Sequence, residues 1–203
     1  MRGPSKSVAF ESPLERDFFI LVDFDSSVCY IEEQPVRIRY FVGEKEKSYF
    51  PDALVRFATE SGKRPVLCEV KTREELWRNW ARLRPGFKAA RRHARDNGWT
   101  FKIFTEREIR GPYLGNIKLL REYRTFPADE LLGARIVRYC ATQETRTLSD
   151  VLEHFSPPGV EKGWLLSQVW HLVAVGRLGT DLSREFDNAM ELRSRRAPLS
   201  LST

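Results

Sequence analysis

The sequence predicts an α/β protein in which a mixed sheet flanked by helices is followed by a small, mostly helical domain. Helix and strand patterns alternate up to about residue 125, and strand patterns nearly vanish after residue 127. The chain has 203 residues, which is long enough to bury a core without disulfides or metals. We therefore expect one domain over residues 1–126 and a second over residues 127–192.

The first domain begins with a helix followed by strands. Ser12 can cap this helix, Pro13 suits its first turn, and apolar residues then recur at helical spacing to about residue 25. Alternation and turn residues predict the next elements. These are a strand at 28–32, a strand at 37–42, a charged turn at 43–47, a strand at 49–59 and its hairpin partner at 65–71.

Helical patterns dominate the rest of the first domain. We expect two helices, at 73–83 and 87–97, because Pro85-Gly86 interrupts the pattern between them. A strand at 99–104 and helices at 106–109 and 113–123 follow.

The second domain reads as three helices and a short hairpin. The helices are expected at 128–141, 148–155 and 163–175, and the hairpin at 176–182. This arrangement is similar to a winged helix-turn-helix domain. We expect the Arg-, Ser- and Pro-rich tail at 193–203 to be disordered.

The positive charge of the chain is concentrated in one region. The net charge is +6, residues 73–110 hold 11 Lys and Arg against 5 Asp and Glu, and the remainder is balanced. Such a basic stretch favours double-stranded DNA as partner over an ordinary solvated helix. We expect Trp77 and Trp80 to pack rather than stack on bases. The candidate phosphate-binding residues are Arg78, Arg82, Arg84, Lys88, Arg91, Arg92 and Arg95.

The sequence lacks the patterns that are typical of membrane proteins, of zinc or disulfide sites and of nucleotide-binding folds. No apolar run approaches the ~20 residues of a membrane span. The three Cys and three His are scattered, which argues against zinc and disulfides and for a reducing cytoplasm. Neither GxGxxG nor GxxxxGK[ST] occurs, so no nucleotide-binding motif is present.

Two short motifs predict a catalytic cluster. Asp52 follows Pro51 at the start of one hairpin strand, and Glu69 and Lys71 lie near the end of the next. Residues i and i+2 of a strand share a face, so Glu69 and Lys71 project together, and the hairpin can bring Asp52 alongside. Glu-x-Lys also occurs on solvated strand faces, and only the flanking apolar strand and basic helices favour a site here.

The chemistry of this cluster suits metal-assisted phosphodiester hydrolysis. Mg²⁺ binds one or two carboxylates and keeps several waters, which fits Asp52 and Glu69. Lys71 could orient the nucleophile or offset charge in the transition state. Glu15 is a fourth candidate. A capping box of the form Ser-x-x-Glu is enough to explain this residue. A Glu on a helix that packs against the sheet could, however, also supply a further metal ligand.

Five short segments follow one another along the first domain: SPLERDF at 12–18, YIEEQP at 30–35, FPDALV at 50–55, EVK at 69–71 and FTEREI at 104–109. Each segment is unspecific alone, and the combination is specific. In this order they resemble the TnsA-type endonuclease subunit of heteromeric cut-and-paste transposases. The resemblance covers about residues 10–125, with a C-terminal domain of the expected kind to about residue 185.

The resemblance implies a restriction-endonuclease-like core of the PD-(D/E)xK type that uses Mg²⁺, with Mn²⁺ as a substitute. Such subunits cut the non-transferred strand at the 5′ ends of the element, while a separate DDE transposase subunit cuts and joins the 3′ ends. Glu15, Asp52, Glu69 and Lys71 match the family's catalytic positions, the three carboxylates as metal ligands. The family's C-terminal domain binds the partner transposase and an AAA+ ATPase regulator. A nucleoid-associated protein of the prokaryotic cytoplasm is implied.

Two other functions stay open at this level. The chain could be a catalytically silent assembly module that bridges DNA and transposition partners. It could also be a stand-alone restriction or junction-resolving nuclease with the same core. The sequence does not decide whether targeting is guided by RNA or by protein, nor whether the C-terminal domain contacts DNA.

Overall fold

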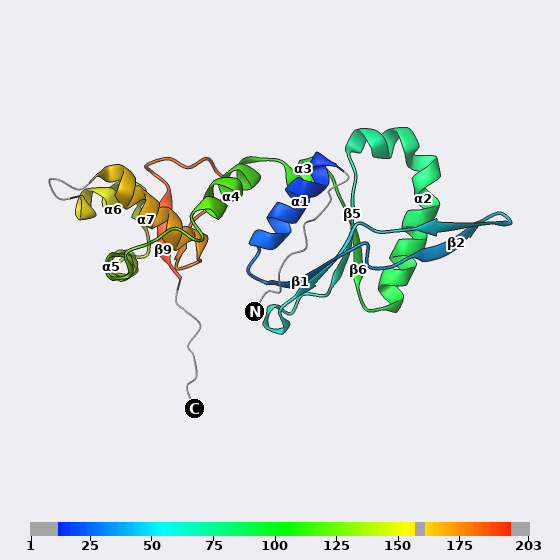
Figure 1. The fold of residues 1–203 in the computed structure, drawn as a ribbon, viewed down its shortest axis with the longest axis horizontal. Coiled ribbons are helices and arrows are strands. Elements are labelled where there is room, and N and C mark those ends of the chain that lie inside the picture. The colour runs from blue at the N-terminus through cyan, green and yellow to red at the C-terminus, as the bar shows by residue number, and fades with distance from the viewer. Residues whose placement is uncertain (1–11, 157–160, 196–203) are drawn as a thin grey trace, which may run out of the picture. The chain divides into compact units, whose positions relative to one another are not determined.

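The structure, a computed structural model, describes residues 12–156 and 161–195 and divides into two compact units between Gly111 and Pro112. The first unit carries the predicted mixed sheet. Its strand order is β1-β4-β5-β6, antiparallel except for the parallel pair of β5 and β6 (Figure 1). The strands are β1 (Val28–Glu33), β4 (Ala53–Phe57), β5 (Val66–Val70) and β6 (Thr100–Phe104).

Helix α1 (Pro13–Phe24) covers one face of this sheet, as predicted. The Ser12 hydroxyl caps it by accepting the Glu15 N–H at 3.1 Å. Leu14 and Phe18 are buried against the sheet residues that face this helix. The capping signal and the apolar spacing therefore predicted this element correctly.

Helix α2 (Arg73–Asp96) covers the other face and is a single helix where the sequence predicted two. Pro85 lies inside it, and Figure 1 shows a sharp bend within the helix. A proline removes one backbone hydrogen bond and kinks a helix. The helix continues because its second half buries Phe87, Ala90 and Ala94.

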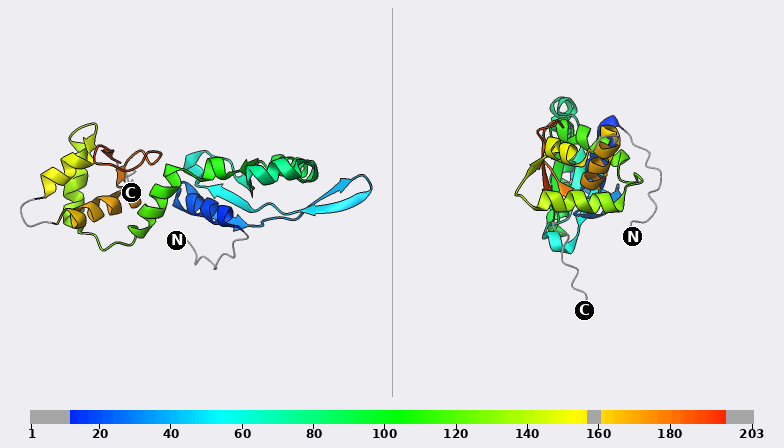
Figure 2. Two further views of the ribbon diagram at one scale, coloured as in Figure 1. Left: turned by 90° about the horizontal axis from the view of Figure 1, so that it is seen from above. Right: turned by 90° about the vertical axis from the view of Figure 1, so that its left-hand side faces the viewer.

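Strands β2 (Ile38–Val42) and β3 (Lys45–Tyr49) form a separate hairpin that extends away from the four-stranded sheet (Figure 2). Val42 pairs with Lys45 across a two-residue turn, in which Gly43 adopts φ +61°. Positive φ at this position is a glycine conformation and suits a tight hairpin.

The prediction of a charged turn at 43–47 and one strand at 49–59 was therefore wrong. Lys45–Tyr49 is a strand, and a break precedes β4. Pro51 lies in the break, where its missing N–H cannot contribute to a strand ladder. The charged residues 45–47 stay solvated because the hairpin is exposed there.

The units meet earlier than the boundary expected at residue 126. Helix α4 (Pro112–Glu122) belongs to the second unit, where it buries Leu114 and Ile117. The His171 Nδ1–H also donates to the Tyr123 carbonyl at 2.8 Å, which ties the end of this helix to α7. Before the division, α3 (Glu106–Ile109) forms where predicted, with a capping box.

The second unit contains the three predicted helices and a small sheet. The strand order of that sheet is β7-β9-β8. The hairpin expected within residues 176–182 does not close there, because β8 pairs with β9, whose residues are 191–194. Residues 193–194 lie in β9, which corrects the start of the disordered tail, while residues 196–203 lie outside the described residues. The elements are α5 (Glu130–Ala141), β7 (Arg146–Thr147), α6 (Leu148–Phe155), α7 (Lys162–Ala174), β8 (Leu178–Gly179) and β9 (Glu191–Ser194).

Helix α7 buries six of its 13 residues, all of them between Leu165 and Val173. Lys162, in its first turn, is its one Lys or Arg. Within the described ranges, no helix has the length and apolar character that a bilayer crossing requires.

Candidate active site

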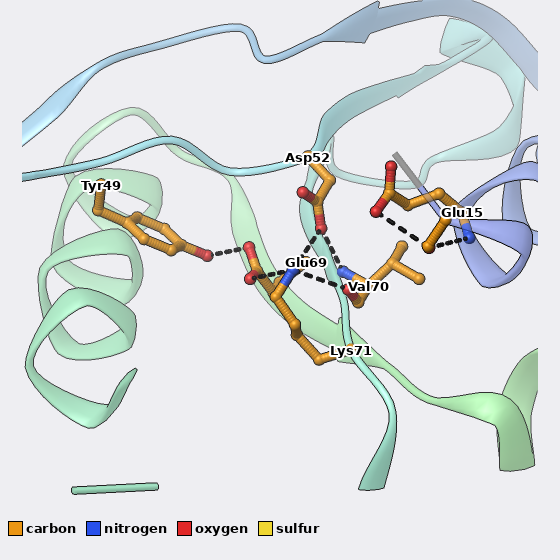
Figure 3. Close-up of polar contacts among 7 residues, drawn as sticks. Glu15, Tyr49, Asp52, Glu69, Val70 and Lys71 are labelled. Carbon is orange, nitrogen blue, oxygen red and sulfur yellow. Dashed lines mark hydrogen bonds and ion pairs between the residues drawn. The ribbon is translucent and has the colours of Figure 1, made fainter. Parts of the chain in front are cut away.

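The hairpin of β4 and β5 brings Asp52 to the Glu69–Lys71 segment, as the sequence predicted (Figure 3). Asp52 directly precedes β4, and its N–H donates to the Cys68 carbonyl at 3.0 Å. Its Oδ2 accepts the Val70 N–H at 2.6 Å. The carboxylate thus extends the strand ladder by one bond, which fixes it beside the end of β5.

Lys71 joins the two carboxylates. Its Nζ lies 3.3 Å from Glu69 Oε1 and 4.0 Å from Asp52 Oδ2, and donates to the Val70 carbonyl at 3.2 Å. Glu69 is only 3% exposed, whereas 21% of the Lys71 side chain is exposed. Solvent therefore reaches the cluster from the side of Lys71 and Asp52.

Burial and charge shift the titration of this cluster. Burial, together with the neighbouring Asp52 carboxylate, raises the pKa of Glu69 to about 7, although Lys71 and a hydrogen bond from Tyr49 oppose the shift. Burial lowers the pKa of Lys71, but Glu69 and Asp52 outweigh it and raise that pKa above its usual value. Lys71 therefore stays charged, while Glu69 titrates near neutral pH.

Tyr49 is a residue of this site that sequence reasoning missed. Its hydroxyl, at the end of β3, donates a hydrogen bond to Glu69 Oε2 (Figure 3). No local pattern marks it, because the contact joins residues 20 positions apart and depends on how the β2–β3 hairpin packs. Its burial and the adjacent Glu69 raise its own pKa well above the usual range, so it is a hydrogen-bond donor at any working pH.

Gly86 makes room for the Tyr49 ring. A Cβ at Gly86 would lie 3.2 Å from Tyr49 Cδ2, which is tighter than ordinary contact. The Tyr49 ring also packs edge-on against Phe87, with centroids 5.9 Å apart. The bend region of α2 therefore packs against Tyr49, whose hydroxyl donates the hydrogen bond to Glu69.

Replacing Tyr49 with phenylalanine tests this support. Tyr49→Phe keeps the ring and removes the hydroxyl, so the pKa of Glu69 should rise further. Cleavage that needs ionised Glu69 should then shift to higher pH, with a loss of about 10- to 100-fold near neutrality, since a hydrogen bond to a charged group contributes about 1.5–3 kcal/mol. The measurement is the pH profile of DNA cutting. Tyr30→Phe, at an exposed tyrosine, is the control, and equal profiles for both variants would contradict the role.

Glu15 lies apart from the pair of carboxylates. Its Oε1 accepts the Ser12 hydroxyl at 3.1 Å, so it takes part in capping. It comes from α1, which packs on the Cys68 and Val70 face, and in the view of Figure 3 Asp52 lies between Glu15 and Glu69. Across residues 12–156 and 161–195, no three His, Cys, Asp or Glu side chains gather tightly enough to hold one metal ion. The predicted three-carboxylate set is therefore not assembled in this geometry.

Asp52 and Glu69 alone do fit a hard divalent cation. Mg²⁺ typically uses one or two protein carboxylates and fills its octahedron with water or phosphate oxygens. Both carboxylates are fixed by hydrogen bonds, and burial together with repulsion from Asp52 raises the pKa of Glu69. A cation between them would relieve that repulsion.

The predicted phosphate-binding residues all lie on α2 and are exposed, but the bend divides them. Lys88, Arg91, Arg92 and Arg95 lie on the second half, opposite the buried residues of that segment. Arg78, Arg82 and Arg84 lie on the first half, where Arg78 pairs with Glu74 at 2.6 Å.

The expectation that both tryptophans of α2 pack was wrong for Trp77, which is 85% exposed. Trp80 is 48% exposed and contacts the Phe87 ring, with centroids 6.0 Å apart. The helical spacing would bury both only if another element covered this half of α2.

Comparison with known families agrees with this architecture. A family model described as TnsA-like endonuclease N terminal matches residues 25–106, and one described as TnsA endonuclease C terminal matches residues 108–182. Glu15 lies outside the matched ranges. A comparison with curated proteins found no match. The two matches follow each other in one chain and meet close to the division of the two units, so the chain belongs to the TnsA family of transposase endonuclease subunits.

Proposed function

We propose that this subunit is a Mg²⁺-dependent DNA endonuclease that cuts the non-transferred strand at the 5′ ends of a transposon during cut-and-paste transposition. One observation carries the proposal: Lys71 bridges Asp52 and Glu69 inside the segment that matches the endonuclease family. A separate DDE transposase subunit would process the 3′ ends, and an AAA+ ATPase would regulate the assembly, in the cytoplasm of a prokaryotic cell. Mn²⁺ would substitute for Mg²⁺.

The residues of the site divide the work. Asp52 and Glu69 would hold the cation, which withdraws charge from the scissile phosphate and acidifies a water. Glu69 must be ionised to do so, and the Tyr49 hydroxyl and Lys71 both favour its ionised form. Lys71, whose side chain is partly exposed, would donate to a phosphate oxygen and offset the charge that develops there. Glu15, on α1, would remain chiefly a capping residue unless α1 shifts when DNA binds.

Strand-specific end mapping tests the proposal. A reconstituted reaction with the partner proteins, transposon-end DNA and Mg²⁺ is run with the wild type and with Asp52→Ala. The variant should leave 3′-end processing intact and lose 5′-strand cutting. Glu144→Ala, at an exposed carboxylate of the second unit, is the control. Full 5′ cutting by Asp52→Ala would reject the assignment, and cutting by the isolated chain would instead favour a stand-alone nuclease.

The second half of α2 would position the duplex by contacts to phosphates. Changing Lys88, Arg91 and Arg95 together to alanine should weaken DNA binding evenly across sequences. The slope of log K against log salt should fall by up to about 3, roughly one per lost phosphate contact. Binding titrations at several salt concentrations measure this slope. An unchanged slope would show that this face does not bind phosphates.

The second unit is better suited to protein partners than to reading DNA. α7 would be the recognition helix of a winged-helix domain, yet its only Lys or Arg is Lys162, in the first turn. We propose that this unit docks the partner transposase or the ATPase. An assembly role alone would predict normal transposition by Asp52→Ala and failure when residues 112–203 are removed.

A further inference from the structure

The first half of α2, residues 73–84, presents an apolar face that no described element covers. Arg73, Leu76, Trp77 and Trp80 recur at i, i+3, i+4 and i+7, so they share one side of the helix. They line a shallow groove of about 470 Å³. The second half of the same helix buries its apolar residues, whereas this half buries none.

The two tryptophans of the groove differ in how far they are packed. Trp80 is held by Phe87, with ring centroids 6.0 Å apart. Trp77 is 85% exposed, and within residues 12–156 and 161–195 no aromatic or cationic side chain contacts its ring. A tryptophan this exposed leaves a large apolar surface in water, which is unfavourable unless a ligand covers it.

The charge around the groove indicates an anionic occupant. Residues 73–84, the half that forms the groove, hold four Arg against two Glu, a net charge of +2, and residues 85–96 add four Lys and Arg against one Asp. Of the acids, Glu74 is already paired with Arg78. Arg73, at the rim of the groove, has an exposed side chain. An aromatic face beside arginines is the arrangement that binds unpaired nucleotides, by stacking on the base and pairing with the phosphate.

The groove lies close to the proposed cut. It begins at Arg73, two residues after Lys71, and the Arg73 N–H is fixed by Glu106 Oε2 at 3.0 Å. Trp77 follows one turn later, about 6 Å along the helix axis. A nucleotide stacked there would therefore lie within a few base-pair steps of the scissile phosphate, since bases rise about 3.4 Å per step.

We propose that the groove formed by Arg73, Leu76, Trp77 and Trp80 binds an unpaired base of the DNA strand beside the cut, with the base stacked on Trp77. This inference rests on the proposed endonuclease function. This face of α2 would recognise a duplex that is locally opened or nicked. The phosphate contacts of the second half of α2 cannot do so, because phosphates are present in opened and intact duplexes alike.

Fluorescence of 2-aminopurine tests the stacking directly. The full-length Asp52→Ala chain, which should not cut, is mixed with two kinds of duplex. In one, 2-aminopurine is unpaired, opposite a gap of one to three nucleotides in the other strand. In the second, 2-aminopurine is paired within an intact duplex. We expect quenching and tight binding for the gapped DNA. Trp77→Ala in the same background should abolish the quench and weaken gapped-DNA binding by about 5- to 150-fold, with little effect on intact duplex. Trp77→Phe should retain most of the quench.

Controls separate stacking from other effects. Leu131→Ala removes an equally exposed apolar residue, 81% exposed, in the second unit and should change nothing. Absence of quenching by the parent chain, or equal loss of gapped and intact binding in Trp77→Ala, would overturn the proposal. So would unchanged DNA binding with lost binding of a partner protein, which would make the groove a protein contact. Retained 5′ cutting by Asp52→Ala would refute the endonuclease assignment without touching the stacking result.

Discussion

Lys71→Ala should reduce 5′-strand cutting by at least about 100-fold while the chain stays folded. The ammonium is the one cation that contacts both Asp52 and Glu69 among the described residues, and its side chain is partly exposed. Loss of a single donor to a developing negative charge costs about 10²- to 10³-fold in other enzymes. Single-turnover cutting at saturating Mg²⁺ measures the effect.

A second substitution separates charge from position at this residue. Lys71→Arg keeps the positive charge, so the thermal stability should stay near that of the wild type. Its planar guanidinium presents its donors in another geometry than the compact ammonium, so the contact to a phosphate oxygen would be misplaced and cutting should remain impaired. Lys162→Ala, at an exposed lysine of the second unit, is the control. Wild-type cutting rates in both Lys71 variants would remove this residue from the mechanism.

The stability of the first unit should fall as pH rises through neutrality because of Glu69. Its pKa is about 7 in the folded chain against 4.5 for an ordinary glutamate, so between these values the folded state binds more protons. The contribution of Glu69 is fully present below about pH 4 and is lost as pH rises through about 7. One pKa unit corresponds to about 1.4 kcal/mol, so the loss amounts to about 3 kcal/mol.

Comparison with Glu69→Gln isolates this contribution, because other carboxylates titrate in both proteins. The free energy of unfolding of both proteins is measured with denaturant at about pH 4 and about pH 8. Between these two pH values the wild type should lose about 3 kcal/mol more than Glu69→Gln. Adding Mg²⁺ at about pH 8 should stabilise the wild type more than Glu69→Gln. Glu60→Gln, at an exposed glutamate, is the control. A pH-independent difference would show that Glu69 titrates normally.

Local sequence patterns predicted the elements that position the site, because each pattern involves only residues that are close in the sequence. The Ser12 cap, the alternation of strand residues and the Glu69-x-Lys71 spacing gave α1, β5 and the orientation of two side chains correctly. The pairing of β4 with β5 then followed from their short connection, and it brought Asp52 to Glu69.

Tertiary packing decided what the sequence could not. Pro85 signals a helix end, but burial of Phe87 and Ala90 kept α2 continuous with a bend. The contact of Tyr49 with Glu69 joins two strands that are far apart in the sequence, and the Tyr49 ring packs beside Gly86 and Phe87 of α2. Helical spacing likewise suggested burial of Trp77, because periodicity cannot tell whether another element is present to cover a face.

The packing of Gly86 against Tyr49 has a consequence for protein engineering. Replacing a glycine inside a helix with alanine is an ordinary route to a more stable protein, with a gain of about 1 kcal/mol from helix propensity. Here the added methyl group would meet the Tyr49 ring at 3.2 Å, so the ring whose hydroxyl supports Glu69 would have to move by a few tenths of an ångström. A thermostabilised version of this chain should therefore leave position 86 unchanged, because the substitution acts on the hydrogen bond from Tyr49 to Glu69.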